Sequence, residues 1–269
     1  MVTARLDWEH VRSLIEKQTG PVLAAEPITE GLNSEIAVIV HTSLGATFIK
    51  GLRSDHRWVW TQQREAEINP YVAQVAPRLR WHVKTDGWNL LGFERVNGRR
   101  VDYSPGSPDL PKVVHVMRRL SKIACPDLPL KNAPQRWASY TNDPELFTGD
   151  QLLHTEWNPG NVLINDAAHL VDWAWPTRGA AWIDPACWVV WLVASGHSPP
   201  SAEDWAAQLT AWRSAPLQAL NAFARVQAAL WEGIAHDDPE PWTERLANAA
   251  RQWAEHRSTS TRNRKGECS

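Results

Sequence analysis

A short polar segment at residues 154–161 carries side chains whose types and spacing suit phosphate chemistry. It reads His154-Thr155-Glu156-Trp157-Asn158-Pro159-Gly160-Asn161, and the run Val171-Asp172-Trp173 follows it. Phosphoryl transfer needs a carboxylate to receive or orient the acceptor hydroxyl, an asparagine to hold metal, and an aspartate to ligate the Mg²⁺ that bridges the phosphates. We therefore expect Glu156, Asn161 and Asp172 to be catalytic, with Asn161 and Asp172 as the metal ligands.

Two short apolar runs indicate how these residues could be brought together. Val162 to Ile164 and His169 to Val171 read as the strands of a hairpin, with Asn161 before the first strand and Asp172 after the second. Such a hairpin would direct both side chains toward one metal site. The alternative interpretation is an ordinary polar hairpin beside a buried His154.

A lysine in the first third of the chain fits the same chemistry. Lys50 stands in the strand-like run Phe48-Ile49-Lys50-Gly51, where it could reach the α- and β-phosphates of a nucleotide. In kinases a glutamate on the following helix holds this lysine. We expect Glu65 to take that role; Glu67 is the competing candidate and lies on another face of the helix.

The turn between the first two expected strands is a candidate phosphate-binding loop. It spans Thr29 to Glu35 and contains one glycine, Gly31. Asn33 or Ser34 could donate hydrogen bonds to phosphate oxygens there. A plain hairpin turn is the equal alternative.

The elements that must position these residues change character near Asn97-Gly98. Before this turn the sequence is mainly strand-like, and after it mainly helical. The expected strands are 24–28, 36–40, 47–52, 79–83 and 88–96. The expected helices are 6–17, 58–75 (kinked or split at Asn69-Pro70), 110–124, 185–194, 202–212, 215–235 and 241–256. We therefore predict an α+β fold with a strand-rich lobe at 1–96, a helical lobe at 97–257 and a flexible tail at 258–269.

Composition narrows the class of protein. The net charge of −2 and the isoelectric point near 6.6 argue against nucleic-acid binding. No run approaches the roughly 20 apolar residues of a membrane span, and the first residues lack the apolar core of a secretory signal. Three scattered cysteines suggest neither a zinc site nor a disulfide framework. We expect a cytoplasmic enzyme, with most of its 17 tryptophans used for core packing.

Nearly the whole chain resembles the aminoglycoside phosphotransferase family of the protein-kinase-like superfamily. The motifs that carry the resemblance are Leu153 to Leu163, Leu170 to Trp173, and Trp182-Ile183-Asp184-Pro185-Ala186. The resemblance implies a bilobal fold, an ATP or GTP donor, two Mg²⁺ ions and a small-molecule acceptor hydroxyl. It also implies that the purine binds backbone groups of Glu94 to Val96. We expect Asp184 to cap the following helix and to support the catalytic loop.

The sequence departs from this family at Glu156, where the family has aspartate. The extra methylene moves the carboxylate by roughly 1 Å or more, and misplacement on this scale can cost on the order of 10²-fold in rate. The site could be adapted to another acceptor position, the enzyme could be slow, or the protein could bind nucleotide without efficient transfer. A peptide Ser/Thr kinase and a nucleotide-binding pseudokinase are therefore the alternatives to a small-molecule kinase.

Two features offer different acceptor sites. The acidic stretch from Asp237 to Glu240 would suit a cationic acceptor, but we favour a solvated connection between helices, since most charged residues simply lie at the surface. Trp157, Trp173 and Trp175 lie on or beside the catalytic segments and would suit an apolar or sugar-like acceptor. The sequence leaves the acceptor, the choice of ATP or GTP and the oligomeric state open.

Overall fold

Strand-rich and helix-rich parts separate clearly along the chain. A computed structural model describes residues 2–28 and 34–266. Unit 1 comprises Met1–Gly98 and Val171–Ala174, and unit 2 comprises Arg99–Leu170 and Trp175–Ser269. Asp172 thus belongs to the strand-rich unit, although the segments before Val171 and after Ala174 belong to the helical one.

Unit 1 contains a five-stranded antiparallel sheet in the order β1-β2-β3-β5-β4. Its strands are β1 (Ala24–Pro27), β2 (Ile36–Thr42), β3 (Gly45–Arg53), β4 (Leu79–Thr85) and β5 (Trp88–Glu94). Asp86 and Gly87 form the two-residue turn between β4 and β5, both with positive φ (48° and 79°). An Asp-Gly pair is typical of this turn because it tolerates that conformation and matches the sheet twist.

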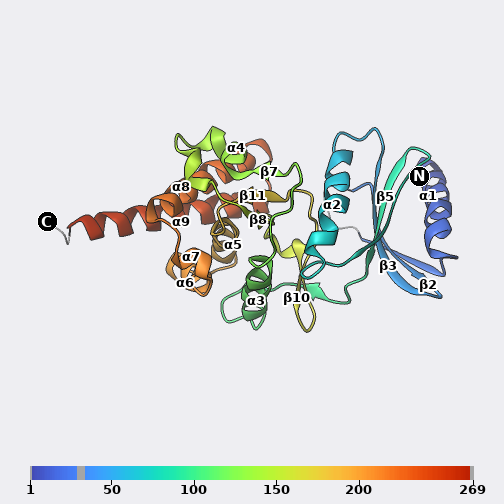
Figure 1. Cartoon of the computed structure of the whole chain (residues 1–269), viewed down its shortest axis with the longest axis horizontal. Helices are drawn as coiled ribbons and strands as arrows, with labels where there is room; N and C mark the ends of the chain where they lie inside the picture. Colours follow the sequence, from blue (N-terminus) through green and yellow to red (C-terminus); the bar gives the residue numbers. More distant parts are fainter. Residues whose placement is uncertain (1, 29–33, 267–269) are drawn as a thin grey trace. The chain divides into compact units, whose positions relative to one another are not determined.

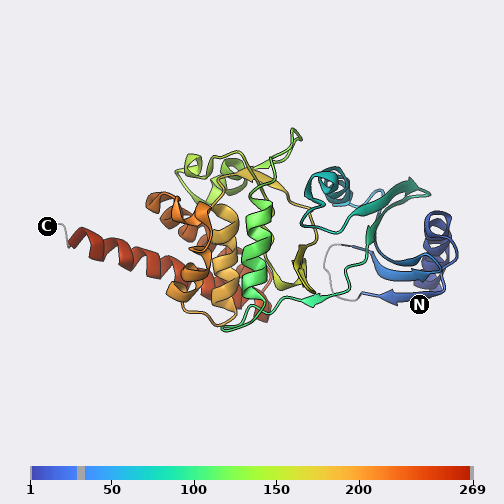
Figure 2. The ribbon, with the colours of Figure 1, turned by 60° about the horizontal axis from the view of Figure 1, so that its bottom comes forward.

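Helices α1 (Val2–Thr19) and α2 (Val59–Val72) cover opposite faces of this sheet (Figures 1 and 2). The alternation of side chains along β3 separates the two faces. Ile49 points into the apolar core that contains Leu14 and Ile15 of α1. Lys50, its neighbour, points to the other face and pairs with Glu65 of α2. The strand period therefore places a buried cation beneath α2.

Unit 2 is mainly helical. Its helices are α3 (Leu110–Leu120), α4 (Ala133–Trp137), α5 (Ile183–Ala194), α6 (Pro199–Ala206), α7 (Thr210–Arg213), α8 (Leu217–Asp237) and α9 (Pro241–Gly266). Helix α5 is buried over most of its length because apolar residues surround it on all sides. It packs against α8 and α9, which lie side by side in Figures 1 and 2.

Two small three-stranded sheets in unit 2 hold the polar segment at residues 154–161. One sheet has the order β10-β9-β6 and the other β7-β11-β8. The strands are β6 (Arg99–Arg100), β7 (Lys131–Asn132), β8 (Gln151–Leu153), β9 (Val162–Ile164), β10 (Ala168–Leu170) and β11 (Thr177–Gly179). The segment begins after β8 and ends, through the 3₁₀ turn η3 (Pro159–Asn161), at β9. The antiparallel pairing of β9 with β10 is the hairpin that the sequence predicted.

Several predicted boundaries differ from the structure. Pro70 does not split α2: the helix runs through it and ends two residues later, at Val72. The predicted helix 202–212 is two helices, α6 and α7, and α3 ends at Leu120. Residues 258–266, which the sequence placed in a flexible tail, continue α9.

The tryptophans serve mostly as core residues in the helical unit. Trp182, Trp188, Trp212 and Trp253 are buried, whereas Trp242 is exposed. Among the described helices, none combines the length and apolar character that crossing a membrane requires.

Candidate active site

An ionic cluster of three side chains lies on the α2 face of the sheet in unit 1. The Lys50 Nζ lies 3.0 Å from Asp172 Oδ1 and forms a second, closer ion pair with Glu65. Lys50 and Glu65 are buried, while the Asp172 side chain is 35% exposed. One cation thus pairs with two carboxylates, of which only Asp172 faces solvent.

The charge balance of this cluster favours a protonated lysine. Burial alone would lower the pKa of Lys50, but the negative charges of Asp172 and Glu65 outweigh burial and raise its pKa above the usual value. Burial raises the pKa of Glu65, and Lys50 partly offsets this effect. Lys50 therefore remains a cation, as a phosphate-binding lysine must.

Helix α2 presents Glu65, rather than Glu67, to the lysine. Glu65 Oε1 also accepts a hydrogen bond from the Trp173 N–H at 3.3 Å. Glu67 lies elsewhere on the helix, where Gln63 Nε2 donates to it at 2.8 Å. The pairing that the sequence favoured is thus the one in the structure.

Buried amide groups fix the position of α2 on the sheet. Asn89 of β5 donates to Gln62 of α2 at 2.9 Å and contacts the His82 ring of β4 at 2.6 Å. At the other end of α2, Asn69 donates to the Pro77 carbonyl and accepts from the Leu79 N–H. These bonds hold Glu65 against Lys50, because Glu65 lies between Gln62 and Asn69 on the helix.

Two residues of the candidate site adopt left-handed backbone conformations. Thr155 has φ of 68° and Asp172 has φ of 62°. A β-branched residue in this region is a genuine outlier, and such strain of about 1–3 kcal/mol persists only where the surroundings hold it. Strained residues of this kind cluster at functional sites.

In unit 2, the Asp184 carboxylate stabilises the polar segment at residues 154–161 through hydrogen bonds. It accepts hydrogen bonds from the His154 N–H (3.0 Å), the Thr155 N–H (2.7 Å) and the Trp157 Nε1–H (2.9 Å). The predicted support of the loop is therefore present. The predicted helix cap is not, because α5 begins at Ile183 and Asp184 lies within its first turn.

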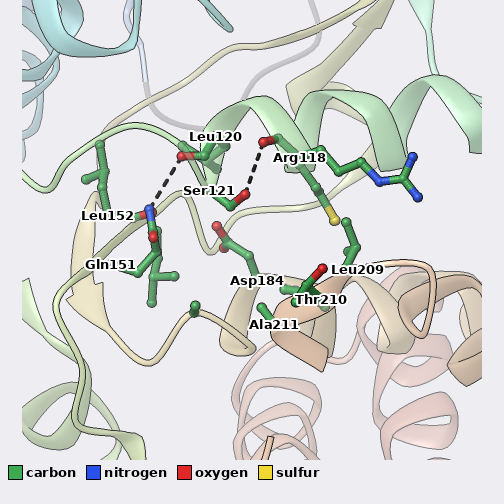
Figure 3. A pocket seen from close by; sticks show the side chains of 13 residues that line it. Arg118, Leu120, Ser121, Gln151, Leu152, Asp184, Leu209, Thr210 and Ala211 are labelled. Atoms are coloured by element: carbon green, nitrogen blue, oxygen red, sulfur yellow. Dashed lines mark hydrogen bonds between the residues drawn. The ribbon is translucent and has the colours of Figure 1, made fainter. Parts of the chain in front are cut away.

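Asp184 also lines a cavity of about 180 Å³ beside β8 (Figure 3). The ends of α3 and α7 and strand β8 form its other walls, with Ser121, Gln151 and Thr210 among the lining residues. Burial raises the pKa of Asp184, while the N–H donors of the loop oppose that shift.

The tryptophans of the catalytic segments differ in what they can contact. Trp157 is fully buried and Trp173 is 2% exposed, so the prediction that they line an acceptor pocket is wrong. Trp157 points its indole N–H at Asp184 instead. Trp175 is half-buried, with the Lys131 Nζ 5.1 Å from its ring centroid.

Glu156 is paired with an arginine that the sequence did not indicate. Arg136 Nη2 donates to Glu156 Oε1 at 2.7 Å. The Glu156 N–H donates to His154 Nδ1 at 3.3 Å, and its carbonyl accepts from Asn161 Nδ2 at 3.2 Å. This hydrogen bond uses the nitrogen of the Asn161 amide. The amide oxygen, which is the atom suited to a hard cation, is not the atom that binds Glu156.

Within 2–28 and 34–266, no group of three or more His, Cys, Asp and Glu side chains could hold a metal ion. Mg²⁺ commonly binds through one or two protein groups plus phosphates and waters, rather than in a full protein cage. The Asp172 carboxylate of unit 1, which is 35% exposed, is a group of the kind that such a metal ion uses. The Asn161 amide oxygen of unit 2 is another.

The remaining predicted nucleotide contacts have mixed outcomes. Asn33 lies outside the described residues, and Ser34 is half-buried beside that gap. The Glu94 N–H donates to the Arg78 carbonyl at 2.9 Å, so this N–H is engaged within unit 1. Val96 follows the end of β5 in irregular backbone, and its contact with a purine stays a prediction.

Acidic side chains of the helical unit, which a cationic acceptor would need, differ in their surroundings. Glu203 is bound by Arg257 and by the Trp253 indole at 2.6 and 2.7 Å, so it serves packing between helices. Asp237, Asp238 and Glu240 are exposed at the end of α8.

Comparison with known proteins identifies the fold. No family model matches the sequence, and no curated protein matches it. Solved structures do match. The choline kinase LicA from Streptococcus pneumoniae has a TM-score of 0.62 at 14% identity, over 91% of this chain and 99% of the other. A thermostable mutant of aminoglycoside phosphotransferase APH(4)-Ia, in ternary complex with ADP and hygromycin B, has a TM-score of 0.58 at 15% identity, over 91% and 99%.

A macrolide 2'-phosphotransferase type I is similar to the same extent. Its TM-score is 0.57 at 14% identity, over 93% of this chain and 97% of the other. These likenesses span almost the whole chain in each case. They confirm the fold class that the sequence predicted, a bilobal protein-kinase-like α+β fold.

Proposed function

We propose that this protein transfers the γ-phosphate of ATP or GTP to a hydroxyl group of a small molecule. The observation that carries the proposal is the cluster of Lys50, Glu65 and Asp172. It combines a buried cation, a helix carboxylate that holds it, and a partly exposed carboxylate suited to Mg²⁺, which is the set of groups that phosphoryl transfer needs.

In this proposal, residues 1–96 bind the nucleotide and residues 97–257 carry the catalytic loop and the acceptor site. Lys50 binds the α- and β-phosphates, and Glu65 keeps it in place. Asp172 and Asn161 hold Mg²⁺, which would neutralise charge on the phosphate oxygens when bound. Glu156 orients the acceptor hydroxyl and accepts its proton.

Two predicted groups complete the nucleotide site. Ser34, with Asn33, would contact the phosphates, and the backbone at Val96 would contact the purine. The nucleotide ligands of the similar structures, ADP and AMP-PNP, support a nucleotide co-substrate.

The acceptor class that we propose is a hydroxylated natural product. The similar structures are an aminoglycoside phosphotransferase in complex with hygromycin B, a spectinomycin phosphotransferase, a macrolide 2'-phosphotransferase and a choline kinase. All of these compounds are hydroxylated small molecules, so they support a small-molecule acceptor over a peptide.

A nucleotide-binding protein without transfer activity is the second candidate. The observation that favours it is the ion pair between Glu156 and Arg136. In this second candidate, the guanidinium would neutralise the Glu156 carboxylate and keep an acceptor hydroxyl from it.

The test is incubation with ATP or GTP and Mg²⁺ against a panel of hydroxylated antibiotics, sugars and amino alcohols. Product is detected by mass spectrometry and ³¹P NMR. We expect at least one phosphorylated product, lost on chelation of Mg²⁺ and reduced about 10²–10³-fold by Asp172→Asn. Asp204→Asn, a change at an exposed position of α6, is the matched control.

Two results would decide against the proposal. Nucleotide binding with Mg²⁺ but no transfer to any acceptor would favour the second candidate. Unaltered nucleotide binding in both Lys50→Met and Asp172→Asn would remove the kinase-like assignment of the site.

A further inference from the structure

We propose that Arg136 is a positioning residue, which fixes the Glu156 carboxylate for the acceptor hydroxyl. This inference rests on the proposed function. Arg136 lies in α4, 20 residues before Glu156 in the chain, and its Nη2 donates to Glu156 Oε1 at 2.7 Å. The side chain of Arg136 is 20% exposed and that of Glu156 is 35% exposed, so the pair is partly shielded from water and remains within reach of a substrate.

The second terminal nitrogen of the Arg136 guanidinium, Nη1, binds both the polar segment and the chain that leads into β11. Arg136 Nη1 donates to Thr155 Oγ1 at 2.7 Å, to Thr177 Oγ1 at 2.9 Å and to the Trp175 carbonyl at 3.2 Å. A guanidinium offers several donors in one rigid plane, whereas the lysine ammonium is a point charge on a flexible stem. The arrangement therefore requires arginine rather than any cation.

Aromatic packing holds the guanidinium itself. Its central carbon lies 5.2 Å from the ring centroid of Trp137 and 5.8 Å from that of Trp175. Trp137 is buried, with edge contacts to Phe223 at 5.0 Å and to Phe147 at 6.2 Å. Helix α4 is short, so these core contacts, rather than helix propensity, determine where Arg136 lies.

The backbone N–H, the backbone carbonyl and one carboxylate oxygen of Glu156 are each hydrogen-bonded to a neighbour. His154 binds its N–H, Asn161 binds its carbonyl and Arg136 binds its Oε1. Thr155, the strained residue before it, is bound by Asp184 at its N–H and by Arg136 at its hydroxyl. Arg136 thus occupies Oε1 and leaves Oε2 as the carboxylate oxygen for an acceptor hydroxyl.

The pair also accounts for a glutamate at this position. Shortening the side chain to aspartate would withdraw the carboxylate by roughly 1 Å or more, as the loss of one methylene requires. From 2.7 Å, that withdrawal exceeds the range of N–H···O hydrogen bonds. Glu156→Asp should therefore break the pair with Arg136 and lower turnover rather than improve it.

The test is a double-mutant cycle on the full chain with an acceptor found by the panel above. Arg136→Gln should lower kcat about 10- to 10²-fold while the KM for nucleotide stays unchanged, because the nucleotide contacts are elsewhere. Arg136→Lys should recover only part of this loss, since it cannot form the fork. In the Glu156→Gln variant, adding Arg136→Gln should lower kcat little further, because the effects of mutating residues that act as a unit are not additive.

A matched control and two contrary results complete the test. Arg178→Gln is the control, because Arg178 of β11 donates to the Pro126 carbonyl and not to Glu156. The proposal is overturned if Arg136→Gln retains the wild-type kcat. It is also overturned if the effects of Arg136→Gln and Glu156→Gln add fully, since independent structural damage predicts that result.

Failure of the proposed function can be distinguished from failure of the positioning role of Arg136. If the wild-type protein phosphorylates no acceptor, crystal structures of wild type and Arg136→Gln still report on Glu156. A Glu156 carboxylate that is displaced in the variant, or that adopts several conformations there, supports the positioning role. An unmoved carboxylate overturns it.

Discussion

The Lys50 ammonium lies 3.0 Å from the Asp172 carboxylate, although 122 residues separate them in the chain. Lys50 is fixed by the pairing of β3 with β2 and β5 on either side. Asp172 lies in the segment Val171–Ala174, which belongs to the same compact unit as that sheet. Because Asp172 also has a left-handed backbone, the ion pair with Lys50 holds a conformation that an aspartate otherwise adopts infrequently.

Replacing Lys50 with methionine should lower stability and activity together. Methionine keeps much of the volume but leaves Glu65 buried without its cation, which costs about 3–5 kcal/mol for a buried pair. Urea unfolding should report a loss of this order, and kcat/KM should fall about 10²–10³-fold. Lys84→Met, at an exposed position of β4, should change neither quantity. An unchanged free energy of unfolding for Lys50→Met would contradict this account of the cluster.

The raised pKa of Lys50 predicts a loss of stability at alkaline pH. The folded state retains the Lys50 proton at pH values where the unfolded chain, with a pKa of 10.5, releases it. The contribution of Lys50 is therefore fully present below about pH 10.5 and is lost as the pH rises through the folded pKa. Burial raises the pKa of Tyr103 as well, with the same sign. The difference in unfolding free energy between wild type and Lys50→Met isolates the lysine.

That difference should stay level from about pH 8 to pH 10 and shrink above about pH 10.5. A difference that remains constant to higher pH would mean that Lys50 has the same pKa in the folded and unfolded states.

Local sequence pattern was sufficient for most of unit 1. Strand alternation places Ile49 and Lys50 on opposite faces, and helix periodicity separates Glu65 from Glu67. Each of these relations depends on neighbours within one element. The pairing of Lys50 with Glu65 joins two elements, so its prediction also needed the lysine–glutamate pair of kinases. The hairpin that follows Asn161 could be expected from its two short apolar runs.

The partner of Glu156 could not be predicted in this way. Arg136 lies in a five-residue helix, which is too short to show a periodic pattern. Its position depends on the parallel pairing of β7 with β11 and on the contact of Trp137 with Phe223. These are tertiary relations between distant segments, and the two-residue strand β7 leaves almost no signal in the sequence. The proximity of Arg136 to Glu156 therefore emerges only from packing.

Replacing Asp184 with asparagine should loosen the catalytic loop. The carboxylate accepts hydrogen bonds from three N–H groups through its two oxygens. In asparagine an NH₂ group replaces one of these oxygens and cannot accept, so at least one N–H group loses its partner. An unsatisfied buried donor costs about 1–3 kcal/mol, and a loop shift near 1 Å can cost about 10²-fold in kcat. Nucleotide affinity should be unchanged because Lys50 and Glu65 lie in unit 1. Asp150→Asn, at an exposed position before β8, is the control. Weakened nucleotide binding in Asp184→Asn would contradict this separation of roles.

Substitutions at Trp157 and Trp175 should separate a structural tryptophan from one that can meet the acceptor. Trp157 is fully buried and donates to Asp184, so Trp157→Phe loses a hydrogen bond to a charged group, worth about 1.5–3 kcal/mol. We expect lower thermal stability and an unchanged KM for the acceptor. Trp175 is half-buried beside Arg136, so Trp175→Leu should raise the acceptor KM several-fold with a smaller loss of stability. Steady-state kinetics and thermal unfolding of both variants measure these effects. If the acceptor KM rises in Trp157→Phe and stays constant in Trp175→Leu, the two assignments must be exchanged.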